Sequence, residues 1–288
     1  MSAAPTWDAL LAASALPRLD ARALAAHASG RPREWLIAHG DEPAEPAAAA
    51  TFAAIAARRR AGEPLAYLVG GREFRGRRFA VSPAVLVPRP ETEGLVDAAL
   101  ARLPAHRAPR VLDLGTGSGA IAVSLALERP DATVVATDAS ADALEVARTN
   151  AAALGAARVD FGLGDWWQAL PADAAPFDCV ITNPPYVAEG DPHLLDAALG
   201  HEPRAALASG PGGLDAIEAI VAGAPARLVP GGWLLIEHGR DQGEAVRARL
   251  AAAGFVEVAT LPDLQGLDRI GLGRRPTDPS PSAGAPTV

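Results

Sequence analysis

The stretch Asp113-Leu114-Gly115-Thr116-Gly117-Ser118-Gly119 decides the fold class of this chain. It follows a short apolar segment, residues 111–114, and it precedes a helical pattern over residues 120–128. Bare glycine backbone lets a ligand approach closely, and the start of a helix offers unpaired N–H groups. A strand, a glycine turn and a helix in this order predict an α/β sheet with a nucleotide-like ligand at the turn.

An acidic residue follows at the spacing that such a turn requires. Asp138 ends a second predicted strand, residues 133–137, and lies 19 residues after Gly119. A carboxylate at this point can accept hydrogen bonds from both hydroxyls of a ribose. Written as Gly115-x-Gly117-x-x-Ala120, however, the turn also satisfies the dinucleotide fingerprint. The turn and its acid alone therefore leave NAD and S-adenosylmethionine (AdoMet) equally open.

Asp165 and Trp166 follow a short third strand, predicted near residues 158–161. The acid could accept a hydrogen bond from the amino group of an adenine, and the flat indole could cover one face of the ring. An exposed turn acid beside a core tryptophan explains the pair without any ligand. Taken alone, the pair favours this simpler interpretation.

The alternation of strand and helix continues outward from the turn. A helix is predicted at Ala141–Leu154, a strand at Phe177–Thr182, a helix at 214–226 and a strand at 233–237. Strands separated by helices form right-handed crossovers, so we expect a parallel sheet covered on both faces. This domain is assigned to residues 88–275.

The remaining parts of the chain differ in character. Residues 1–71 show short helical patterns and one longer helix over 47–60, so we expect a small helical bundle. Residues 72–87 predict a β-hairpin connector, with phenylalanines and valines separated by Gly76 and Pro83. Residues 276–288 contain almost nothing to bury and are predicted to be a disordered tail.

The segment Asn183-Pro184-Pro185-Tyr186 discriminates between the open alternatives. It follows the buried strand Phe177–Thr182, at the carboxyl edge of the sheet where the glycine turn also lies. Two prolines lack N–H groups and turn the chain out of the sheet, so that carbonyl oxygens become free acceptors. With the Asn183 side chain and the Tyr186 ring, they form a pocket for a planar group that bears an NH₂. A methyltransferase acting on amide or amino nitrogen needs such a pocket, whereas a dehydrogenase does not.

Composition narrows the functional class further. The net charge is −8, and it is uneven: residues 1–108 hold 14 Arg against 11 acids, whereas residues 109–288 hold 12 Arg against 23 acids. Because readers of nucleic acid present basic surfaces, the acidic part argues against a nucleic-acid substrate. The single cysteine, Cys179, excludes an internal disulfide and a cysteine-based metal site. The sequence shows no basic leader and no long apolar run, so we expect a cytoplasmic protein that does not associate with a membrane.

These motifs together resemble the AdoMet-dependent methyltransferases that modify planar NH₂ groups. Within them, the chain is similar to the HemK/PrmC family, which methylates a glutamine of class I peptide chain release factors. The narrower resemblance is carried by Arg72-Glu73-Phe74, Val87-Pro88-Arg89-Pro90-Glu91-Thr92-Glu93, Asp191-Pro192-His193, Glu202-Pro203, Gly231-Gly232, Glu237-His238-Gly239 and Asp268-Arg269-Ile270. It extends through Arg275 and includes the helical N-terminal part, residues 1–71, which the resemblance implies is a substrate-recognition domain.

The resemblance implies a Rossmann-like methyltransferase sheet, AdoMet as the cofactor (product S-adenosylhomocysteine), no metal, and a monomer. It assigns catalysis to Asn183, Pro184 and Tyr186, with Pro185 added for substrate binding. The positions assigned to the cofactor are Gly115, Thr116, Gly117, Ser118, Gly119, Asp138, Asp165, Trp166 and Asn183. Tyr186 would fix the amide plane of the glutamine.

Three alternatives remain at this point. A glutamine of a ribosomal protein is a neighbouring substrate, although the run from Pro88 to Glu93 resembles the release-factor branch. Adenine in DNA or RNA would also fit the corner, but charge and the absence of a recognisable base-reading domain speak against it. A non-catalytic AdoMet-binding scaffold is the third. The basic clusters Arg58-Arg59-Arg60 and Arg72 to Arg78 are expected to be solvated surface, with contact to an acidic partner as the alternative.

Overall fold

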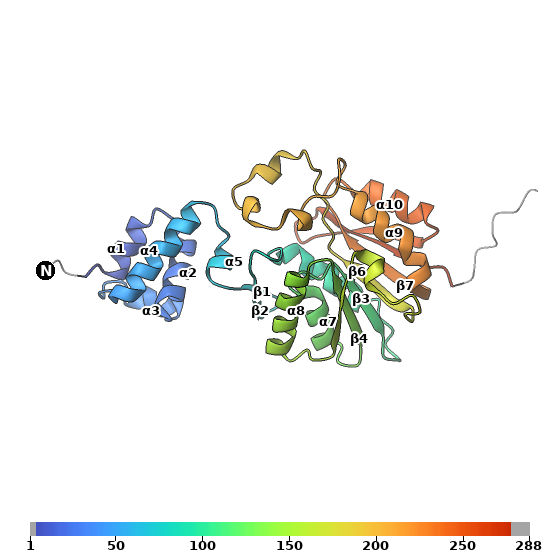
Figure 1. Cartoon of the computed structure of the whole chain (residues 1–288), viewed down its shortest axis with the longest axis horizontal. Coiled ribbons are helices and arrows are strands. Elements are labelled where there is room, and N and C mark those ends of the chain that lie inside the picture. Colours follow the sequence, from blue (N-terminus) through green and yellow to red (C-terminus); the bar gives the residue numbers. More distant parts are fainter. Residues whose placement is uncertain (1–3, 278–288) are drawn as a thin grey trace, which may run out of the picture.

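The computed structural model describes residues 4–277 of the chain (Figure 1). Helices occupy its N-terminal part, and a mixed α/β part holds the glycine turn. The predicted disordered tail lies outside the described residues except for its first two positions. No helix within residues 4–277 has the length and apolar character needed to cross a membrane.

The N-terminal part consists of short helices packed around one apolar cluster. Trp7, Leu24, Leu36 and Phe52 are all buried in this cluster, and the Trp7 and Phe52 rings meet edge to face. The helices are α1 (Trp7–Ala13), α2 (Arg18–Ser29), α3 (Arg33–Ala38), α4 (Pro46–Arg60) and α5 (Leu65–Leu68). In Figure 1 the first four form a separate body, and α5 lies between it and the α/β part.

The connector contains the expected hairpin, made by β1 (Arg72–Phe74) and β2 (Arg77–Phe79). Arg75 and Gly76, the two residues of the turn, both have positive φ (50° and 68°), as a type I′ hairpin turn requires. Phe74 and Phe79 are almost fully buried and belong to the core of the α/β part. The hairpin therefore packs its two phenylalanines into the core of the α/β part, while Arg78 of β2 donates to the carbonyl of Val69 at the end of α5.

The α/β part is built on a seven-stranded sheet with the order β5-β4-β3-β6-β7-β9-β8. Its strands are β3 (Arg110–Leu114), β4 (Thr133–Asp138), β5 (Val159–Leu163), β6 (Phe177–Thr182), β7 (Leu228–Glu237), β8 (Val256–Pro262) and β9 (Asp268–Arg274). Strands β3 to β7 are parallel, whereas β9 is antiparallel to both neighbours. The helices are α6 (Glu93–Leu100), α7 (Ala120–Glu128), α8 (Ala141–Leu154), α9 (Asp215–Arg227) and α10 (Gly243–Ala252).

Side chains of successive strand residues pack on opposite faces of the sheet. Val111 of β3 joins the apolar cluster that contains α6 and α7, whereas Leu112 and Leu114 join the cluster that contains α9 and α10. Both faces are thus covered, as predicted. The chain runs from β3 outward through β4 and β5, and then returns to β6 on the other side of β3. The carboxyl ends of β3 and β6 therefore flank the switch point of the sheet, where α/β folds bind ligands.

The sequence prediction of a parallel sheet was incomplete at the C-terminal end. The antiparallel strands β8 and β9 and the helix α10 were not predicted, and β7 begins at Leu228 instead of residue 233. The glycines of β9 obscure its strand pattern, yet they are required there. A Cβ at Gly271 would lie 2.5 Å from Cγ1 of Val246 on α10, so only glycine allows this packing.

Candidate active site at the carboxyl edge of the sheet

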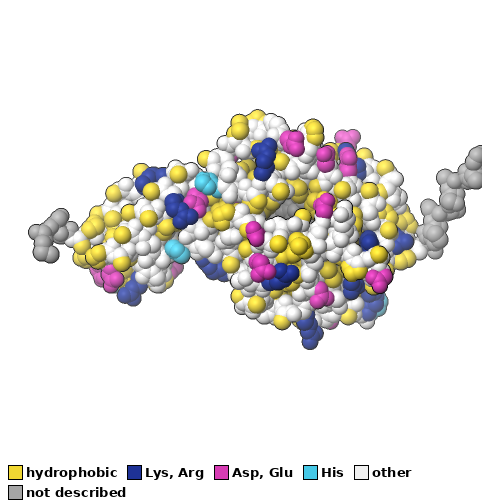
Figure 2. All heavy atoms as spheres, in the orientation of Figure 1, with side chains coloured by type: hydrophobic (Ala, Val, Ile, Leu, Met, Phe, Trp, Pro, Cys, Tyr) yellow, Lys and Arg dark blue, Asp and Glu magenta, His cyan; other side chains and the backbone are white. Residues whose placement is uncertain are grey.

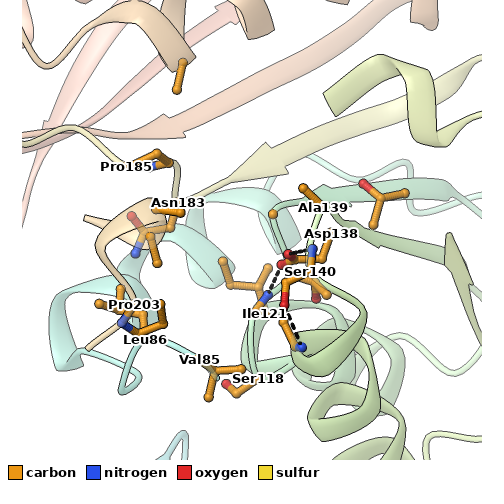
Figure 3. Close-up of a pocket in the computed structure, with 18 of the residues that line it drawn as sticks. Val85, Leu86, Ser118, Ile121, Asp138, Ala139, Ser140, Asn183, Pro185 and Pro203 are labelled. Atoms are coloured by element: carbon orange, nitrogen blue, oxygen red, sulfur yellow. Dashed lines mark hydrogen bonds between the residues drawn. The ribbon is translucent and has the colours of Figure 1, made fainter. Parts of the chain in front are cut away.

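A cavity of about 710 Å³ opens at the switch point of the sheet. Its volume lies in the usual range for ligand pockets. In Figure 2 it is the hollow near the middle of the face, below the arc formed by the segment that follows the Asn-Pro-Pro-Tyr corner. Its walls come from the glycine turn, the ends of β4, β5 and β6, the connector and residues 203–219. Figure 3 shows Asp138 and Ser140 on one side and Asn183 and Pro185 on the other.

The glycine turn forms one wall of the cavity. Gly115, Thr116, Gly117 and Ser118 all line it. Gly115 and Gly117 have φ of +71° and +55°, and no atom lies within 4 Å of the position that a Cβ of Gly117 would take. The backbone at Gly117 is therefore open to a ligand and stays open only with glycine.

Gly119, the last glycine of the turn, was also assigned to the cofactor from the sequence. It has φ +80° and directly precedes α7, but it is not among the residues that line the cavity. A Cβ there would lie 3.1 Å from Cβ of Ala147 on α8. Its role in this structure is close packing between α7 and α8.

Asp113 supports the turn from below. Its carboxylate is fully buried and accepts hydrogen bonds from the Thr116 hydroxyl (2.7 Å) and from the backbone N–H of Ala122 (3.2 Å). Burial raises the pKa of Asp113 to about 7, since the hydrogen bonds offset only part of the desolvation. The acid therefore fixes the shape of the turn without lining the cavity.

Asp138 links the turn to the next strand and helix. Its two oxygens accept hydrogen bonds from the backbone N–H groups of Gly117 and Ser140, each at 2.9 Å (Figure 3). Ser140 in turn caps α8 by accepting from the N–H of Ala143. The carboxylate of Asp138 also lines the cavity, and each oxygen keeps a second lone pair for a ligand hydroxyl.

Asp165 and Trp166 both line the same cavity, after the end of β5. Trp166 has a positive φ of 42°, which is unusual for a bulky residue. The edge of its indole lies 3.4 Å from the position of a Cβ on Gly115. The tryptophan is thus held against the glycine turn, in a backbone conformation that carries strain.

The Asn-Pro-Pro-Tyr corner forms the opposite wall, but only two of its residues reach the cavity. Asn183 and Pro185 line it, whereas Pro184 is buried and Tyr186 packs into the apolar cluster behind it. The Asn183 Nδ2 group donates a hydrogen bond to the Thr92 hydroxyl at 3.2 Å. This bond leaves the Asn183 carbonyl oxygen available as an acceptor.

A polar cluster that the sequence did not single out as functional lies behind the corner. Thr92 donates to Oε2 of Glu237 at 2.7 Å, and the Tyr186 hydroxyl donates to Oε1 of Glu237 at 3.4 Å. Burial raises the pKa of Glu237 to about 7, although Thr92 and the charge of Arg269 oppose the shift. Thr92 and Glu237 both belong to the motifs that carry the family resemblance. The signal that could have found Glu237 is its place at the end of the strand beside β6.

An ion pair supports one wall of the cavity. Arg89 lines the cavity and pairs with Glu202 at 2.5 Å, and the side chain of Glu202 is only 2% exposed. Arg89 and Glu91 belong to the run that carries the family resemblance, and neither was assigned to the site from the sequence. For Arg89 the ion pair is what the structure contains.

The basic clusters of the sequence are largely satisfied within the chain. Arg58 pairs with Glu63, Arg59 pairs with Asp20, and Arg60 donates to the carbonyl of Ser14. In the hairpin, Arg75 and Arg77 share the carboxylate of Glu128. These contacts give the clusters a structural role on the surface of the protein.

Comparison with known proteins agrees with this geometry. A family model described as methyltransferase small domain matches residues 96–213, and one described as PrmC N-terminal domain matches residues 6–70. Two solved structures share the fold, each with a TM-score of 0.53. A methyltransferase from Pyrococcus furiosus is 19% identical and covers 70% of this chain and 91% of its own. A 16S rRNA N2 G1207 methyltransferase from T. thermophilus is 23% identical and covers 71% and 49%.

Curated relatives are much more similar in sequence. A release factor glutamine methyltransferase from Bordetella pertussis is 56% identical over 92% of this chain and 97% of its own length. The protein of the same name from Escherichia coli K12 is 44% identical over 92% and 94%. The resemblance expected from the motifs is confirmed over nearly the whole chain. The chain belongs to the release factor glutamine methyltransferase family.

Proposed function

We propose that this protein transfers a methyl group from AdoMet to the side-chain amide nitrogen of a glutamine in class I peptide chain release factors. The observation that carries the proposal is one cavity that joins the glycine turn to Asn183. The turn provides a place for a nucleoside, and the Asn-Pro-Pro-Tyr corner provides acceptors for a planar NH₂ group. The names of the relatives supply the identity of the protein substrate.

The residues at the turn fit the nucleoside part of AdoMet. The open backbone at Gly117 leaves room for the ligand, and Asp138 offers free lone pairs toward the ribose hydroxyls. Asp165 and Trp166 would lie beside the adenine, with the acid accepting from its amino group. Gly115, Thr116 and Ser118 complete this wall. The bound cofactor supplies an activated methyl group on a sulfonium.

The corner fits the acceptor. An amide nitrogen is a poor nucleophile because its lone pair is delocalised into the carbonyl group. A hydrogen bond from one of its N–H groups to Asn183 Oδ1 would orient the lone pair and stabilise growing positive charge. The second assigned acceptor, the Pro184 carbonyl, belongs to a buried residue that does not line the cavity, so the contact with Asn183 carries the proposal. Holding donor and acceptor in line contributes about 7–11 kcal/mol in favourable cases. Tyr186, which packs behind the cavity wall, would support the amide plane from that position.

The alternatives from the sequence are less well supported. Adenine in DNA or RNA would demand a basic surface, whereas the catalytic part of the chain is acidic. A ribosomal-protein glutamine shares the chemistry, but the relatives are named for release factors. The helical residues 1–71 would contribute substrate recognition, with the hairpin of 72–87 as connector. We further propose a monomer that acts in the cytoplasm without a metal.

Mass spectrometry of the substrate tests the proposal. A purified release factor is incubated with this protein and AdoMet and then digested. We expect one added methyl group, located on a glutamine side chain. A ribosomal-protein fraction and duplex DNA, incubated in parallel with labelled AdoMet, should remain unmodified. Methyl transfer to either of these, with none to the release factor, would refute the proposal.

A further inference from the structure

One buried carboxylate connects the two functional side chains of the Asn-Pro-Pro-Tyr corner. Glu237 is 1% exposed, and it accepts from the hydroxyl of Thr92 at 2.7 Å and from that of Tyr186 at 3.4 Å. The Thr92 oxygen in turn accepts from Asn183 Nδ2 at 3.2 Å. Thr92 is 4% exposed and lines the cavity beside Asn183.

The direction of this chain of hydrogen bonds follows from elementary chemistry. An ionised carboxylate can only accept, so the Thr92 hydroxyl must give its single proton to Glu237. The Thr92 oxygen can then only accept from the corner, and the group of Asn183 that faces it must be the NH₂. The other end of the Asn183 amide, its carbonyl oxygen, is thereby fixed as the acceptor for the substrate.

The negative charge also acts through the chain. Hydrogen bonds in sequence polarise one another, and they do so more strongly in a buried environment. The charge of Glu237 polarises the Thr92 hydroxyl, and the Thr92 oxygen in turn polarises the Asn183 NH₂ group. The result is a larger negative partial charge on Asn183 Oδ1. A stronger acceptor at this point favours the transition state, in which positive charge grows on the attacking nitrogen.

We propose that Thr92 and Glu237 are positioning residues for methyl transfer, which fix the orientation of the Asn183 amide and strengthen its carbonyl oxygen as an acceptor. The inference rests on the proposed function, because it assigns a purpose to an oriented Asn183. Neither residue touches the reacting atoms. Their effect is therefore expected in the rate of the chemical step and not in cofactor affinity.

The charged groups around Glu237 predict a dependence on pH. Burial raises its pKa to about 7, and the negative charge of Glu91 acts in the same direction. Arg269 of β9 lowers the pKa, as do the hydrogen bonds from Thr92 and Tyr186. The neighbouring His238 is itself buried, and burial lowers its pKa, so that it adds no positive charge near neutrality. Below pH 7 Glu237 becomes protonated and can donate, so the order of the chain is lost and the rate should fall.

The decisive experiment measures single-turnover methylation of a release factor at saturating AdoMet. Thr92→Val removes the hydroxyl and keeps the shape, so the rate should fall about 10- to 100-fold while S-adenosylhomocysteine binds unchanged. Thr92→Ser keeps the hydroxyl and should restore most of the rate. Thr149→Val, on the exposed face of α8, is the matched control and should behave as the wild type.

The pH profile supplies a second, independent test. The wild-type rate should decline from pH 8 to pH 6, and Glu237→Gln, which cannot ionise, should be slow and should lose the part of this decline that Glu237 causes. Asp113 also has a pKa raised to about 7, but its contribution would persist in Glu237→Gln. If Thr92→Val fails to bind S-adenosylhomocysteine, the pH profiles of the wild type and of Glu237→Gln test the positioning role in its place.

Each result has a defined meaning. An unchanged rate in Thr92→Val, or a pH decline in Glu237→Gln as steep as that of the wild type, would overturn the positioning role while leaving the proposed function intact. If the wild type itself left the release factor unmethylated, the proposed function and this inference would both fall. A slow Thr92→Val, rescue by Thr92→Ser and a shallower pH decline in Glu237→Gln than in the wild type would establish the role.

Discussion

The carboxylate of Glu202 accepts a hydrogen bond from the backbone N–H of Val87 at 3.0 Å and pairs with the guanidinium of Arg89 at 2.5 Å. These contacts join the end of the connector to the segment that follows the Asn-Pro-Pro-Tyr corner. Glu202 lies 113 positions after Arg89 in the sequence. Because residues of both segments line the cavity, the buried ion pair holds two of its walls together.

Loss of the Arg89 charge should destabilise the protein more than loss of an exposed arginine. In Arg89→Met the Glu202 carboxylate stays buried with only the Val87 N–H as a partner. We expect a loss of about 1–3 kcal/mol in the free energy of unfolding, at the lower end because Arg89 itself is partly solvated. Urea unfolding measures it, with Arg148→Met as the control. Arg148 forms an exposed pair with Glu145 and should change stability by less than about 0.5 kcal/mol. Equal losses in the two variants would refute the role of the buried pair.

Gly119 and Gly155 offer a matched pair of substitutions, since their φ angles are +80° and +81°. Gly155→Ala meets no atom within 4 Å, so it should cost only the conformational penalty of about 1–2 kcal/mol. Gly119→Ala adds a contact at 3.1 Å with Ala147, and we expect a total of about 2–4 kcal/mol. Thermal and urea unfolding of both variants measure the difference. If Gly119→Ala were no worse than Gly155→Ala, close packing would not be the reason for glycine at position 119.

Asp138→Asn should weaken cofactor binding. Both oxygens of Asp138 accept from backbone N–H groups, whereas an asparagine would turn its NH₂ toward one of these donors. The lost charge-assisted hydrogen bonds correspond to about 10- to 100-fold in affinity for S-adenosylhomocysteine, measured by calorimetry. Asp142→Asn, in the exposed first turn of α8, is the control. Affinity retained in Asp138→Asn would contradict the ribose-binding assignment.

The sequence predicted the parts of the fold that local chemistry decides. Helices α7 and α8 and strand β6 begin and end at the predicted residues, because a glycine turn, a serine cap and a proline pair set their limits. Strand β9 was missed because its glycines serve contacts with α10 and Phe255, which no local pattern reveals.

The same distinction holds for the site. Gly117, Asp138 and Asn183 line the cavity, and each belongs to a motif that can be read in one stretch of sequence. The partnership of Thr92 with Glu237 joins residues 145 positions apart, and it depends on the register between β6 and β7. At Gly119 the motif is visible in the sequence but its reason is not, because a glycine there can serve ligand contact or close helix packing.

The uneven charge of the chain predicts an effect of salt on encounter. Residues 109–288 are strongly acidic, and Figure 2 shows acidic side chains around the hollow. We expect the region of the release factor that carries the glutamine to be basic and therefore attracted to this face. The Michaelis constant for the release factor should therefore rise steeply with ionic strength, at constant AdoMet, whereas that for AdoMet should change little. A flat profile for the release factor would remove the attraction and leave the chemistry untouched.

Asn183→Ala separates an enzyme from a scaffold that only binds AdoMet. The substitution removes the side-chain acceptor for the substrate NH₂ group but leaves the glycine turn and Asp138 in place. We expect turnover to fall at least about 100-fold, with most of the affinity for S-adenosylhomocysteine retained. Gln265→Ala, in the exposed turn between β8 and β9, controls for the loss of an amide elsewhere. A scaffold predicts instead that cells carrying Asn183→Ala keep the biological role, because binding alone would suffice. Full methylation of the release factor by this variant would place the acceptor contact on some group other than Asn183.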